Sequence, residues 1–147
     1  MAVVRVYVPL GRADLQTFAS TGSLAATATS PRPAYAVTSL LQASAPGLDV
    51  EDLEFAAFTD AVEAAGAHRS APGHRRVVVA ADADPSWVVA GAGEPVSGVA
   101  LVAHLPLARV ASFHVDDEST EGGAEEEPDE LLWYDVTELD DVCSFLA

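Results

Sequence analysis

Apolar and polar side chains alternate with a period of two in several short stretches, a pattern that predicts β-strands with one buried face. In the first of these stretches, Val4, Val6 and Val8 point to one side, whereas Arg5 and Tyr7 point to the other. Pro9 and Gly11 follow and end it. Counting also the more apolar stretches, we expect strands at residues 3–8, 34–37, 75–81, 96–105, 110–115 and 131–134.

Two of these stretches are apolar on both faces, which is typical of strands in the middle of a sheet. One contains a run of three valines followed by two alanines, from Val77 to Ala81. The other, residues 96–105, is expected to form one long strand with a possible bulge at Gly98.

Apolar residues spaced three and four apart predict helices between the strands. The clearest helix is expected at residues 50–66, where Asp49 precedes the first turn. One broad face of it is assigned to the core: Leu53, Phe55, Ala57, Phe58, Ala61, Val62 and Ala65. Shorter helices are expected at residues 13–20, at residues 39–45 after Thr38, and after a capping box formed by Asp135 and Glu138.

This order of elements predicts an α+β fold in a single domain that spans residues 1–147. We expect one mixed sheet of about five strands, with helices mainly on one face. A ferredoxin-like arrangement would fit the same order but is not required by it.

Acidic residues dominate the charge of the chain, which is −16 at pH 7. Thirteen of the 23 acidic residues fall between Asp116 and Asp141, a stretch without any basic residue. Residues 116–130 contain too few apolar side chains to bury, so we expect a mobile loop there. A surface of this charge repels phosphates, which argues against nucleic acids and anionic membranes as partners and favours a cationic protein partner or a divalent metal.

Cysteine content and hydropathy set the expected location. Cys143 is the only cysteine, so no disulfide can form within the chain, as is usual in a reducing compartment. No apolar stretch approaches the ~18 residues of a membrane span. We therefore expect a cytoplasmic protein, and no motif in the sequence predicts a cofactor.

Five sequence blocks carry a resemblance over nearly the whole chain. They are Arg5-Val-Tyr-Val-Pro9, Leu53-Glu-Phe-Ala-Ala-Phe58, Arg75-Arg-Val-Val-Val-Ala-Ala-Asp82, His114-Val-Asp-Asp117 and Leu131-Leu-Trp-Tyr-Asp135. In this order they resemble a family of small uncharacterised actinobacterial proteins. The resemblance implies a single intact domain of bacterial cytoplasmic origin. The family has no assigned activity, so the resemblance implies no catalytic or binding residue.

The polar faces of two predicted strands supply the candidate binding residues. Arg5 and Tyr7 share one face of the first strand, and Ser112, His114 and Asp116 share one face of a later strand. If these strands are neighbours and the face is uncovered, the side chains form one patch, to which Trp133 or Tyr134 would add an aromatic surface.

Other motifs are weaker on inspection. Gly91-Ala-Gly93 resembles the start of a dinucleotide fingerprint, but Glu94 and Pro95 would oppose a pyrophosphate, so we expect a turn. The acidic segment fits no calcium-loop register. His114, Asp116 and His104 have residue types that can ligate a metal, but strand-end histidines and aspartates more often cap turns.

Two function hypotheses remain from the sequence. The first and favoured one is a non-enzymatic protein-interaction or regulatory module, because catalytic motifs are missing. The second is a small enzyme or metal-binding protein that uses His114 and Asp116. A concave pocket that holds these groups would favour the second hypothesis, and a flat surface would favour the first.

Overall fold

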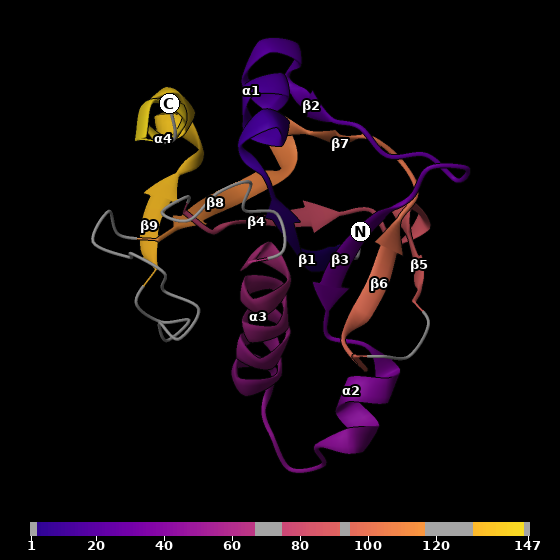
Figure 1. Cartoon of the computed structure of the whole chain (residues 1–147). Helices are drawn as coiled ribbons and strands as arrows, with labels where there is room; N and C mark the ends of the chain where they lie inside the picture. Colours follow the sequence, from indigo (N-terminus) through magenta and orange to yellow (C-terminus); the bar gives the residue numbers. More distant parts are fainter. Residues whose placement is uncertain (1–2, 67–74, 92–94, 117–130, 146–147) are drawn as a thin grey trace.

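A seven-stranded antiparallel sheet forms the centre of the molecule (Figure 1). The computed structural model describes residues 3–66, 75–91, 95–116 and 131–145. The strands run in the order β5-β6-β3-β1-β4-β8-β9. Their bounds are Val4–Leu10 for β1, Arg32–Ala36 for β3, Val77–Ala83 for β4, Val88–Ala90 for β5, Gly98–Leu101 for β6, Val110–Val115 for β8 and Leu132–Asp135 for β9.

The expected α+β class with one main sheet is confirmed, but the expectation of about five strands in a mixed sheet is wrong. Within the described residues every strand pair is antiparallel. Asp84 caps a 3₁₀ turn at Pro85–Trp87 and the chain then returns as β5, which the sequence pattern did not predict. The long strand expected at residues 96–105 is divided into β6 and a two-residue strand β7, Leu105–Pro106, which pairs with β2, Ser23–Leu24.

Strand β1 lies in the middle of the sheet, between β3 and β4, and is buried on both faces. The expectation of a strand with one exposed face is therefore wrong for β1. Val6 and Val8 are fully buried on one side, and Tyr7 retains only 8% exposure on the other. The prediction that β4 is a central strand is correct.

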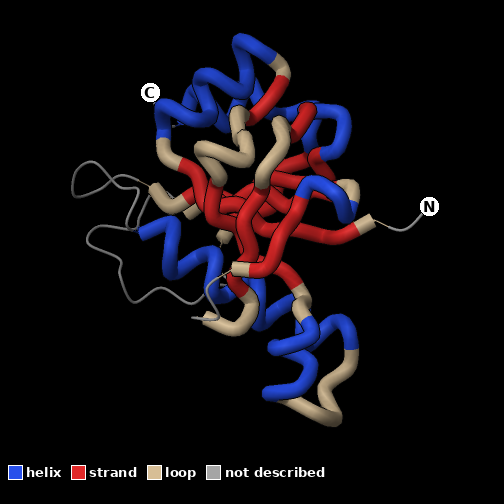
Figure 2. Tube along the Cα trace, turned by 90° about the vertical axis from the view of Figure 1, so that its right-hand side faces the viewer, coloured by secondary structure: helices blue, strands red, loops and turns tan. Residues whose placement is uncertain are grey.

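Helices cover both faces of the sheet, which corrects the expectation that they lie mainly on one (Figure 2). Helix α1, Arg12–Thr21, and helix α4, Leu139–Phe145, pack against the face that carries Val6, Val8 and Phe113. Helix α2, Ser39–Ser44, and helix α3, Val50–Gly66, pack on the opposite face with Tyr7 and Val78. Two separate cores result, because residues that alternate along the central strands feed opposite faces.

Local signals explain the helix ends. The Asp49 carboxylate accepts the backbone N–H of Asp52 at 2.9 Å, so α3 begins where the sequence predicted. Thr38 caps α2 by accepting the N–H of Leu41 at 3.0 Å. Helix α1 ends at Gly22, whose φ of 78° lies in the left-handed region.

The apolar face of α3 differs from its prediction at one residue. Phe58 is 9% exposed and belongs to the core, as expected, but Phe55 is 50% exposed. Of the acidic segment expected to form a mobile loop, residues 117–130 lie outside the described residues. No helix in the described ranges has the length and apolar character needed to cross a membrane.

Candidate functional site

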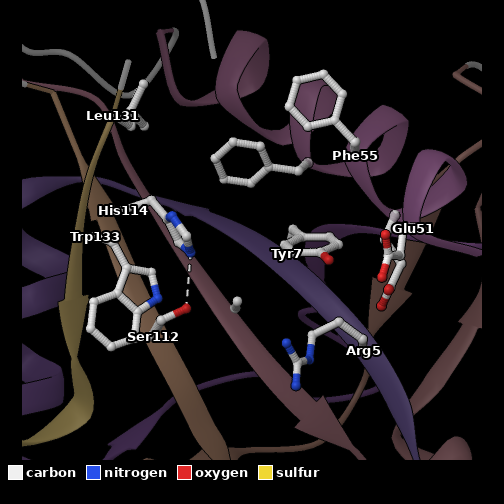
Figure 3. Close-up of a pocket in the computed structure, with 11 residues that line it drawn as sticks. Arg5, Tyr7, Glu51, Phe55, Ser112, His114, Leu131 and Trp133 are labelled. Atoms are coloured by element: carbon white, nitrogen blue, oxygen red, sulfur yellow. Dashed lines mark hydrogen bonds between the residues drawn. The ribbon is translucent and has the colours of Figure 1, made fainter. Parts of the chain in front are cut away.

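A cavity of about 450 Å³ lies between α3, β9 and the sheet (Figure 3). Its floor is formed by side chains of the sheet: Arg5, Tyr7, Ala80, Ser112 and His114. Its walls come from α3 and from the chain at and before β9: Glu51, Glu54, Phe55, Phe58, Leu131 and Trp133. The volume falls in the range of about 300–1,000 Å³ that ligand pockets occupy.

Strand register brings the floor residues together. Tyr7 lies opposite Ala80, and Ala80 lies opposite Ser112, so these three side chains cross the sheet in one row. Arg5 and His114 are two residues away along β1 and β8 and therefore share the same face. Strands β1 and β8 are not neighbours, because β4 runs between them. The small side chain of Ala80 leaves the space between Tyr7 and Ser112 open.

Helix α3 supplies one wall through residues that share one of its faces. The wall residues are Glu51, Glu54, Phe55 and Phe58, whose spacing of three, four and seven is that of a helical stripe. Across the cavity, Trp133 on β9 lies opposite His114 in the strand register. Trp133 is 61% exposed and Phe55 is 50% exposed, so both rings are largely open to solvent.

The aromatic rings on this side of the sheet contact one another, with Phe58 edge to face against Tyr7 and His114 and tilted against Phe55. Phe58 lies 5.7 Å from Tyr7 and 4.9 Å from His114 between ring centroids, and Phe55 lies 6.3 Å from Phe58. Such pairs hold rings in defined orientations, which fixes the shape of the cavity before any ligand arrives.

His114 is neutral at physiological pH. Burial, with a smaller effect from the positive charge of Arg5, lowers the pKa of His114 from 6.5 to about 4. Its Nε2 atom is 2.9 Å from Oγ of Ser112, and the tautomer decides which of the two donates (Figure 3).

Carboxylates outnumber cations at the end of the cavity where Arg5 lies. The Arg5 guanidinium donates to Asp82 through Nε at 2.8 Å and through a terminal nitrogen at 3.3 Å, so Asp82 offsets its charge. Glu51 and Glu54 line the same end. Burial, and secondarily the negative charge of Glu54, raises the pKa of Tyr7 to about 12.

Asp116 does not join the other four predicted binding residues. Its side chain is fully buried. Its carboxylate accepts a hydrogen bond from a terminal guanidinium nitrogen of Arg76 at 2.7 Å and another from the backbone N–H of Arg76 at 2.6 Å. Its own N–H donates to the carbonyl of Arg76, which continues the pairing of β4 with β8 beyond Val115. The geometry assigns Asp116 to a buried ion pair that stabilises the fold, and not to the cavity.

The metal-binding hypothesis gains no geometric support. No three His, Cys, Asp or Glu side chains within the described ranges are grouped to hold a metal ion. His104 is exposed before β7, where its Nδ1 accepts the N–H of Ala26 at 3.1 Å. Cys143 packs against the core of the other sheet face, and burial raises the pKa of its thiol.

Sequence reasoning missed the contribution of α3. It placed Phe55 in the core and did not include any residue of this helix among the candidate binding residues. The stripe formed by Glu51, Glu54, Phe55 and Phe58 was the available signal, because two carboxylates and two rings on one helix face indicate a boundary between core and solvent.

A model of a family of unknown function, DUF6912, matches residues 4–143 of the chain. No curated protein and no solved structure matches it.

Proposed function

The chain belongs to this family of unknown function, and from its cavity we propose that it is a non-catalytic module that binds a protein partner. The partner inserts one side chain between α3 and β9. The observation that carries this proposal is the pair of exposed rings, Trp133 and Phe55, on the two sides of a preformed cavity.

The residues that dominate binding in protein interfaces support this proposal. Binding energy concentrates in a few aromatic residues and arginines that meet in well-packed pockets. Trp133 and Phe55 are large apolar groups that the fold does not bury, and Tyr7 and Phe58 close the cavity beneath them. A partner side chain placed there would remove both exposed rings from water, which is favourable in proportion to the apolar area covered.

Site-specific crosslinking tests the proposal. A photoreactive phenylalanine analogue at position 133 is expected to capture a partner in cells of the native organism, and the same analogue at position 89 is not. Val89 is the matched control because it is also exposed, at 47%, but lies on β5 at the opposite edge of the sheet.

A second substitution tests whether crosslinking from position 133 depends on the cavity. Phe55→Ala should abolish the adduct formed from position 133, because it removes the facing wall. Equal adducts from positions 133 and 89, or an adduct that persists in Phe55→Ala, would contradict the proposal.

The 2.9 Å contact between Ser112 and His114 favours a second candidate, a hydrolase with Ser112 as nucleophile and His114 as base. We rank it lower because a histidine with a pKa of about 4 takes up a proton poorly at neutral pH. A fluorophosphonate probe distinguishes the two candidates. Labelling that disappears in Ser112→Ala would establish the hydrolase, and we expect none.

A further inference from the structure

The charge distribution around the cavity indicates which side chain it accepts. The lining carries two carboxylates, from Glu51 and Glu54, and a third carboxylate, from Asp82, is held by Arg5. Because His114 is neutral, Arg5 is the one positive group of the lining against three nearby carboxylates. The cavity is therefore a region of negative potential in a chain whose net charge is −16.

The aromatic walls add to the attraction for cations. The faces of tryptophan, phenylalanine and tyrosine rings carry partial negative charge and attract guanidinium and ammonium groups. Trp133 and Phe55 are exposed on opposite walls, and Glu51 and Arg5 lie at the far end from Trp133 (Figure 3). The chain already makes such a contact elsewhere, where the Arg109 guanidinium lies 4.9 Å from the centroid of the Trp87 ring.

On the basis of the proposed function, we infer that the inserted group is an arginine side chain from a basic segment of the partner protein. Its methylenes pack against Trp133, and its guanidinium lies on the ring of Phe55 and reaches the carboxylates of Glu51 and Glu54. A planar guanidinium fits better than an ammonium, because it can stack on a ring and donate to a carboxylate at the same time.

An anionic group fits the same cavity poorly. Arg5 is the one cation that could receive it, and two of its nitrogens already donate to Asp82. An incoming carboxylate or phosphate would also be repelled by the carboxylates of Glu51 and Glu54, which line the cavity together with Arg5.

The experiment compares two peptides that differ in the charge of one side chain. Acetyl-Gly-Arg-Gly-amide and acetyl-Gly-citrulline-Gly-amide have side chains of nearly the same shape, but citrulline is neutral. Each is titrated into the protein while the indole N–H of Trp133 and the backbone N–H groups of Ser112 and His114 are followed by NMR. We expect the arginine peptide to bind at least about tenfold more tightly.

Glu54→Gln should weaken the arginine peptide about threefold or more and leave the citrulline peptide unchanged. Glu63→Gln is the matched control, because it removes the same charge from an exposed position of α3 that does not line this cavity. Should Glu54→Gln unfold the protein, Glu51→Gln provides the same comparison.

Equal binding of the two peptides, absence of binding at millimolar concentrations, or tighter binding of a glutamate peptide would overturn the inference. These outcomes concern the side chain that the cavity accepts. Failure of the crosslink from position 133 would instead refute the binding module itself, so the two proposals fail separately.

Discussion

At the scale of single residues, His114 makes the stability of the folded protein depend on pH. Its pKa is about 4 in the folded protein and near 6.5 in an unfolded chain. Between these values the unfolded state binds more protons than the folded state, so stability increases with pH. The contribution of His114 is complete above about pH 6.5 and is lost as the pH falls towards 4.

We therefore expect His114→Gln to flatten the dependence of unfolding free energy on pH between about 4 and 6.5. The shift corresponds to at most about 3 kcal/mol over this window. Urea unfolding of both proteins at several pH values measures this dependence. Subtracting the unfolding free energy of the variant from that of the wild type removes the effect of the many carboxylates, which the two proteins share.

Two ion pairs of the same residue types differ in burial and should differ in their effect on stability. The side chains of Arg76 and Asp116 are 5% and 0% exposed, whereas those of Arg5 and Asp82 are both 37% exposed. Breaking a buried pair leaves an uncompensated charge away from water, and breaking an exposed pair does not.

Asp116→Asn is expected to lower the unfolding free energy by about 3–5 kcal/mol. The matched substitution Asp82→Asn should cost less than about 1 kcal/mol. Chemical denaturation of both variants provides the comparison. Similar losses in the two proteins would show that Asp116 is not the buried partner of Arg76.

At the scale of secondary-structure elements, α3 carries both a buried and an exposed aromatic side chain. Phe58 is 9% exposed and contacts Tyr7 and His114, whereas Phe55, three residues earlier, is 50% exposed. Phe58→Ala should cost about 3–5 kcal/mol because it leaves a cavity in the core. Phe55→Ala should change stability by less than about 1 kcal/mol, which thermal unfolding of both variants would establish.

The helices and strands also show which features of the fold can be predicted from the sequence alone. The bounds of α3 and β8 were predicted because their periodicity is local and Asp49 caps the helix. Strand order was not predicted, since no local pattern indicates that β4 separates β1 from β8.

The same limit applies to the candidate site. Alternation along β1 and β8 placed Arg5, Tyr7, Ser112 and His114 on the correct faces. The wall from α3 and the partner of Asp116, which lies 40 residues away, depend on tertiary contacts that leave no local pattern.

At the scale of the whole molecule, net charge governs which partners can approach. With −16 charges and seven arginines as its only Lys or Arg residues, the chain lacks the basic footprint needed to displace counterions from DNA or RNA. We expect no detectable shift of duplex DNA or single-stranded RNA in a gel assay at about physiological salt. A clear shift under those conditions would contradict this expectation and the negative potential on which it rests.

The central position of β1 has a consequence for synthesis of the protein on the ribosome. Translation delivers β1 first, but one of its two neighbours, β4, is made only after β3 and three helices, and β4 in turn needs β8. Until β4 has been synthesised, β1 has an unpaired edge, and α3 has no completed sheet on which to bury its apolar face. Nascent chains that end before β4 therefore expose apolar strand and helix surface that the finished fold buries, and β1 gains its second neighbour only after translation has passed β4.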